Sequence, residues 1–92
     1  MDYTSIIKPP VSKVLKSGRV ILKPEEEVGE HVTDKREEVI IILKGTATLV
    51  NEGNEFKVEA GETYFVPENK KHNVINKGTE KLEYIYVVSL FE

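Results

Sequence analysis

The sequence predicts an all-β fold, either a sandwich or a small barrel, in a single domain of 92 residues. No stretch of about ten or more residues combines a helical hydrophobic period with helix start and stop signals. Val and Ile are abundant, and turn-forming residues recur about every 8 to 12 residues, as they do between the short strands of sandwiches and barrels. A chain of this length has room for one hydrophobic core, so we treat residues 1–92 as one domain.

The N-terminal part of the chain is expected to hold short strands. Residues 1–12 contain Pro9-Pro10, which fits neither a helix interior nor a central strand, so this segment forms an arm or a short strand. Strands are expected at residues 11–16 and 19–23, with Ser17-Gly18 as the turn between them.

The rest of the chain alternates strands and turns. An extended piece at residues 31–33 and a turn at residues 34–37 lead into a strand at residues 38–44. The centre of that strand, residues 39–43, is apolar at every position, which predicts that both of its faces are buried. Further strands are expected at residues 46–50, 55–58, 63–66, 72–76 and 81–90.

Composition and charge exclude several classes of function. A net charge of -3 from 13 basic and 16 acidic residues, spread along the chain, argues against binding to nucleic acid or to an anionic membrane. Without cysteine there is no disulfide and no thiolate metal site. The apolar runs are too short to span a bilayer and the N-terminus lacks a signal-peptide pattern, so we expect a cytoplasmic protein. Lys and Glu carry most of the charge and Gln is absent, a composition typical of hyperthermophiles.

One stretch of the chain contains a strand, a polar turn and a second strand that opens on a histidine. Its spacing, with Gly61, Pro67, Asn69, His72 and Asn76 in order, is similar to the second sequence motif of the cupins. Cupins usually have glycine where Asn69 stands. Because Asn is the next best residue for a left-handed turn position, the departure is mild.

A second stretch, upstream of the first, resembles the first cupin motif. His31, Glu38 and Gly45 occupy motif positions, while Thr33 stands where the motif has its second histidine. Glu37 also satisfies the loose spacing, and we favour Glu38 because six residues then separate it from Gly45.

Resemblance to the cupins covers about residues 19–90 and implies a small jelly-roll β-barrel with a divalent metal ion inside. In the family the metal is held by two neighbouring histidines, a glutamate and a histidine from the second motif. Carried over to this chain, the ligands are His31, Glu38 and His72. Such a set suits Fe(II), Mn, Ni, Cu or Zn and leaves coordination positions open for water or substrate. The missing imidazole at Thr33 predicts that metal binding is weak or absent.

Several other side chains are expected at the pocket wall. Residues two apart on a strand share a face, so position 33 would point inward with position 31. Two isoleucines share the expected strand face of Glu38, and two tyrosines share a face of the final strand and fit the pocket wall, the core or a subunit interface equally well. The candidates for the wall are Thr33, Ile40, Ile42, Tyr84 and Tyr86.

Two functions are compatible with these residues. The first is a small single-domain cupin that uses a divalent metal to hold or transform a small molecule. The family includes oxygenases, isomerases and decarboxylases, and the fold does not choose among them. The alternative is a non-catalytic, metal-free module that binds a sugar or an organic acid, in which the histidines are ordinary surface or core residues. The two-faced apolar strand, the small size and the family resemblance also predict a homodimer.

Overall fold

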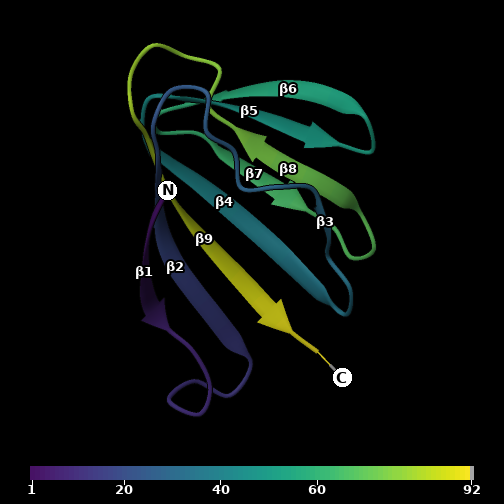
Figure 1. The fold of residues 1–92 in the computed structure, drawn as a ribbon. Coiled ribbons are helices and arrows are strands. Elements are labelled where there is room, and N and C mark those ends of the chain that lie inside the picture. The colour runs from purple at the N-terminus through teal and green to yellow at the C-terminus, as the bar shows by residue number, and fades with distance from the viewer. Residues whose placement is uncertain (92) are drawn as a thin grey trace.

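Within residues 1–91, which the computed structural model describes, the chain forms antiparallel β-strands and no helix (Figure 1). The strands are β1 (Asp2–Ile7), β2 (Leu15–Leu22), β3 (His31–Val32), β4 (Arg36–Lys44), β5 (Thr46–Asn51), β6 (Asn54–Glu59), β7 (Thr63–Val66), β8 (Lys71–Ile75) and β9 (Leu82–Leu90). The predicted all-β class is confirmed. In this part of the chain there is accordingly no helix of the length and hydropathy needed to cross a membrane.

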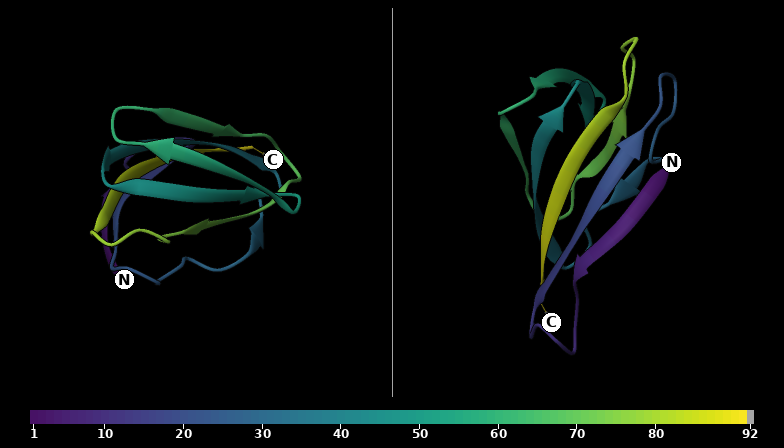
Figure 2. Two further views of the ribbon diagram at one scale, coloured as in Figure 1. Left: turned by 90° about the horizontal axis from the view of Figure 1, so that it is seen from above. Right: turned by 90° about the vertical axis from the view of Figure 1, so that its left-hand side faces the viewer.

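The strands form two sheets that lie face to face (Figure 2). A five-stranded sheet has the order β1-β2-β9-β4-β7, and a four-stranded sheet has the order β3-β8-β5-β6. This is the expected jelly-roll arrangement. The expected closed barrel is not formed, however, because no strand ladder among the described residues joins the edge of one sheet to the edge of the other.

Apolar side chains from alternate strand positions fill the space between the sheets. Ile40 and Ile42 of β4 are fully buried, as are Leu22 of β2 and Leu82 of β9. The four-stranded sheet contributes Leu49, which is also fully buried. Each such side chain stabilises the fold by about 1.5 to 3 kcal/mol relative to an exposed position. The alternation that predicts the strands therefore also holds the two sheets together.

The N-terminal segment forms a strand and not a free arm. The expected turn at Ser17-Gly18 is wrong, because this dipeptide lies inside β2. β1 pairs with β2, and β2 runs without a break through this dipeptide. A Cβ atom at Gly18 would lie 2.7 Å from a ring carbon of Tyr3 and 2.8 Å from a ring carbon of Tyr86. Glycine is thus needed here because two aromatic rings meet across the strand, and not because the chain turns.

The apolar segment 39–43 is predicted to be buried on both faces, but its outer face, on the outside of the five-stranded sheet, is only partly buried. Its inner positions are buried, but Val39 and Leu43 on the outer face are 37% and 40% exposed. Phe65 of β7, directly opposite Val39, is 53% exposed. Among the described residues, the inner face of this segment is therefore buried as expected, whereas its outer face stays partly exposed.

Candidate metal centre

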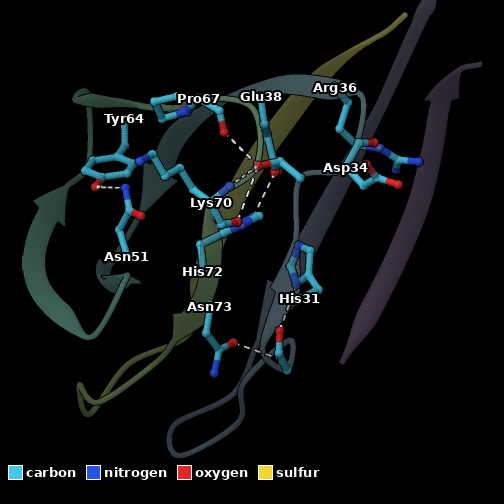
Figure 3. A network of polar contacts seen from close by, with 12 residues as sticks. His31, Asp34, Arg36, Glu38, Asn51, Tyr64, Pro67, Lys70, His72 and Asn73 are labelled. Atoms are coloured by element: carbon cyan, nitrogen blue, oxygen red, sulfur yellow. Dashed lines mark hydrogen bonds and ion pairs between the residues drawn. The ribbon is translucent and has the colours of Figure 1, made fainter. Parts of the chain in front are cut away.

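The two histidines of the chain lie opposite each other on neighbouring strands (Figure 3). The antiparallel pairing of β3 with β8 sets His31 directly against His72. Directly opposed residues point to the same side of a sheet, and the centroids of the two rings are 4.1 Å apart. The short strand β3 thus brings the first-motif histidine to the second-motif histidine.

His72 is held between the sheets, with 1% of its surface exposed. Its Nδ1 lies 3.3 Å from the carbonyl oxygen of Lys70, and its Nε2 lies 3.0 Å from Oε1 of Glu38. Because a carbonyl can only accept, the Nδ1–H donates to Lys70 and Nε2 faces the carboxylate. The bond between Nε2 and Oε1 needs a proton on one of the two groups. A metal ion bound between them would take the place of that proton.

Glu38 approaches from the opposite layer. A turn at residues 34–35 precedes β4 and decides which of two adjacent glutamates faces inward. Glu38 is 9% exposed and contacts His72, whereas Glu37 is exposed. The choice between Glu37 and Glu38, which spacing alone leaves open, is resolved by this contact.

His31 is exposed and is oriented by its own loop. Its Nδ1–H donates to the carbonyl oxygen of Gly29 at 2.8 Å, which leaves Nε2 for a metal. Asn73 fixes this loop, because its Oδ1 accepts from the Gly29 N–H at 2.9 Å and its Nδ2 donates to Oε1 of Glu27 at 3.2 Å. Sequence reasoning missed Asn73. Its one signal in the sequence is an asparagine within a strand, where asparagine is uncommon.

One ligand atom from each of His31, Glu38 and His72 can be chosen so that all three atoms lie within 4.8 Å of one another. Two imidazoles and a carboxylate around a metal ion leave positions open for water or a substrate. Each imidazole also donates its other ring N–H to a backbone carbonyl, which is the support that metal-binding histidines usually have. The donor set therefore fits a divalent metal ion.

Thr33 occupies the position of the second motif histidine and lines the same cavity as the cluster, but its hydroxyl is engaged with the neighbouring turn. Its hydroxyl donates to the carbonyl oxygen of Pro67 at 2.7 Å and accepts from the N–H of Lys70 at 3.1 Å. Between these two residues, Asn69 has a φ of 61°, the left-handed conformation, and its N–H donates to the carbonyl oxygen of Thr33 at 2.7 Å. Thr33 thus ties the end of β3 to the turn that leads into His72.

A cavity of about 220 Å³ lies beside the cluster, between the two sheets. Three of the expected wall residues, Thr33, Tyr84 and Tyr86, line it. Ile40 and Ile42 do not line it and lie entirely within the core. The larger tyrosine side chains, which are paired with these isoleucines across β9 and β4, reach the cavity instead.

The wall also contains polar residues that sequence reasoning missed, namely Tyr3, Lys16 and Arg36. Arg36 could have been found, because it stands two residues before Glu38 on the same strand and so shares its face. Tyr3 and Lys16 had no such signal. They reach the cavity through the pairing of β1 with β2 and of β2 with β9.

Comparison with known sequences agrees with this geometry. The sequence pattern of the cupin domain matches residues 18–88. Over 72 residues the chain is 29% identical to the oxalate-binding protein of Thermotoga maritima, an alignment that covers 78% of this chain and 60% of that protein. It is 25% identical over 72 residues to the tetracenomycin polyketide synthase protein TcmJ of Streptomyces glaucescens, covering 78% of this chain and 48% of that protein. The chain thus spans between about half and three fifths of these relatives.

Solved structures show the same fold. A Thermotoga maritima protein described as a predicted oxalate decarboxylase superimposes with a TM-score of 0.90 at 24% identity, covering 97% of this chain and 79% of that chain. At this identity the likeness concerns the fold alone. Because the cupin pattern extends over most of the chain, from β2 into β9, and includes all three candidate ligands, this protein belongs to the cupin family.

Proposed function

We propose that this cupin binds one divalent metal ion through His31, Glu38 and His72 and uses the open positions to hold or transform a small-molecule ligand. The observation that carries the proposal is the convergence of three ligand atoms within 4.8 Å beside a cavity. Fe(II), Mn, Ni, Cu and Zn all accept such donors. When bound, the metal would polarise an oxygen atom of the ligand.

The size of the cavity supports a small ligand. Its volume of about 220 Å³ is below the range of about 300 to 1,000 Å³ found for pockets that take drug-sized molecules. The relative named for oxalate binding also supports a small molecule. Because the same fold hosts many chemistries, we assign no reaction to the site.

Metal titration of the untagged, metal-free protein by calorimetry tests the proposal. Two adjacent glutamates offer a matched pair of variants, since Glu38 faces His72 and Glu37 is exposed. We expect Glu38→Gln to weaken the binding of Mn or Zn by about tenfold or more, and Glu37→Gln to change it by less than about twofold. Wild-type protein that binds none of the five metals more tightly than about 1 mM would overturn the proposal.

The second candidate function is a metal-free cupin that binds a sugar or an organic acid. It is favoured by Thr33, whose hydroxyl is engaged with Pro67 and Lys70 and so supplies no fourth protein ligand. A thermal shift with sugars or organic acids, together with none for metals, would support this candidate. A shift with metals would count against it.

We also propose that the protein is a homodimer. Leu15, Val39 and Phe65 line a shallow apolar groove on the outer face of the five-stranded sheet, and each is more than a third exposed. A second copy of the chain would cover this face. Light scattering is expected to give the mass of a dimer for the wild type and of a monomer for Phe65→Glu. A monomer mass for the wild type over a wide concentration range would contradict the proposal.

A further inference from the structure

The cavity wall formed by the five-stranded sheet carries a phenol that is free to bind a ligand. Tyr84 is 3% exposed and lines the cavity. Within residues 1–91, no hydrogen bond joins its hydroxyl to another residue. The hydroxyl is not among the fully buried polar atoms that lack a partner, so it is reachable from the cavity that Tyr84 lines and is available to a molecule there.

Tyr86, two residues further along β9, forms a pair with Tyr3 of β1. The hydroxyl oxygens are 2.6 Å apart, and the rings stack with centroids 6.1 Å apart at an angle of 15°. The pair meets across β2 at Gly18, where any larger residue would collide with both rings. Two hydroxyls carry two hydrogen atoms and one of these lies in the bond between them, so the pair has one O–H left to donate.

The protonation of these phenols suits a donor role. Burial raises the pKa of Tyr84 and of Tyr86 above the ordinary range. The carboxylate of Glu38 raises the pKa of Tyr84 further, and the hydrogen bond with Tyr3 does so for Tyr86. Both hydroxyls therefore keep their protons at neutral pH. A ligand that accepts hydrogen bonds is matched to this wall.

The charged groups of the wall favour an anion. Lys16 and Arg36 line the cavity, and Glu38 is the acidic member of the lining among the described residues. Nε of Arg36 donates to the carbonyl oxygen of Asp34 at 3.3 Å, and the guanidinium carries further N–H groups that can donate to a ligand. A metal ion held by His31, Glu38 and His72, which line the same cavity, would add further positive charge.

We propose that the ligand is a small carboxylate anion. Its carboxylate accepts hydrogen bonds from Tyr84 and from the Tyr3–Tyr86 pair, while Arg36 and Lys16 supply positive charge. The inference rests on the proposed function, which makes this cavity the ligand site. The hydrogen-bond donors are side chains of the protein and do not depend on a bound metal. A hydrogen bond to a charged acceptor is about twice as strong as one between neutral groups, so a neutral sugar is disfavoured.

Malonate and malonamide, a dicarboxylate and its neutral diamide of similar shape, are the probes. Each is titrated by calorimetry into the metal-free and into the metal-loaded protein. We expect malonate to bind about tenfold or more tightly than malonamide in both forms. Tyr84→Phe removes one oxygen atom and is expected to lower the malonate affinity about tenfold while leaving the metal affinity unchanged.

Tyr64→Phe is the matched control. It removes a hydroxyl that accepts from Nδ2 of Asn51 at 3.1 Å and that belongs to a residue outside the cavity lining. The malonate affinity of this variant should stay within about twofold of the wild type. If Tyr84→Phe does not fold, as judged by circular dichroism, Tyr86→Phe replaces it with the same expectation.

The outcomes separate this inference from the proposed metal centre. A protein that binds no metal but binds malonate, with a loss of affinity in Tyr84→Phe, would refute the metal centre and support the carboxylate ligand. A protein that binds metal but not malonate would refute the carboxylate ligand and leave the metal centre in place. Equal affinities for malonate and malonamide, or an unchanged malonate affinity in Tyr84→Phe, would also refute the carboxylate ligand and leave the metal centre in place.

Discussion

The two histidines of the candidate metal centre are directly opposed in the four-stranded sheet, yet they are held in different ways. His72 is 1% exposed and contacts Glu38 of the opposite layer. His31 is exposed and is held by the carbonyl of Gly29, two residues before it in the chain. One ring is therefore positioned by the packing of the two sheets and the other by its own loop. We infer that a substitution of His72 changes both the stability of the fold and the binding of metal, whereas a substitution of His31 changes mainly the binding of metal.

The change expected to have the largest effect is His72→Ala. It removes a fully buried ring and leaves the carboxylate of Glu38 without its partner. We expect the free energy of unfolding, measured by urea denaturation, to fall by about 2 to 4 kcal/mol, and metal binding to be lost. In the double variant with Glu38→Gln the destabilisation should be smaller than the sum of the two single effects, because no charged carboxylate is then left unpaired. Additive effects would show that the two side chains are not coupled.

An intermediate effect is expected at Thr33, which holds the turn before His72. Thr33→Val keeps the shape of the side chain but removes the hydroxyl that bonds Pro67 and Lys70. The free energy of unfolding should fall by about 1 to 2 kcal/mol, and Thr33→Ser should retain most of the stability. The metal affinity of Thr33→Val, measured by calorimetry, should fall less than that of either histidine variant. A loss of metal binding as complete as in His72→Ala would instead make Thr33 a ligand.

His31→Ala should change stability little while weakening metal binding. The ring is exposed and its one protein hydrogen bond is to a nearby carbonyl, so we expect the free energy of unfolding to stay within about 0.5 kcal/mol of the wild type. The affinity for Mn or Zn should fall about tenfold or more. Denaturation and metal titration of the same preparation check both values. A stability loss like that of His72→Ala would remove the distinction between the two histidines.

The smallest effect is expected at alkaline pH and concerns Tyr84, another side chain that the packing of the sheets buries. Burial raises the pKa of Tyr84, so the folded protein keeps this proton at pH values where the unfolded chain has lost it. The corresponding stability is fully present below about pH 10, the ordinary tyrosine value, and is lost as the pH rises further. Unfolding followed from pH 9 to 11 should show a shallower decline for Tyr84→Phe. Parallel curves for the two proteins would contradict this.

Much of the fold follows from the order of residues close together in the chain. The strand expected at residues 63–66 coincides with β7, and Asn69 adopts the left-handed conformation that its turn requires. His31 and His72 also lie in strands, as the residues around each of them predict. Alternation and turn chemistry act between near neighbours, which is why a sequence can reveal them.

Contacts between distant segments decided the remaining features. Gly18 lies within a strand and not in a turn because β2 pairs with β1 and β9 on either side of it, and it is glycine because the rings of Tyr3 and Tyr86 meet beside it. Tyr3 and Lys16 joined the cavity wall for the same reason, since no local pattern relates them to the motifs.

The sequence by itself determined that this chain is an all-β cupin with two histidines and a glutamate at motif positions. Only the tertiary structure decided that Glu38 and not Glu37 meets His72, and that the Thr33 hydroxyl is engaged with the neighbouring turn. The reason is physical. The face on which a residue lies after a turn, and the partner of a buried polar group, depend on how the two sheets pack, and that free energy comes from residues far apart in the chain.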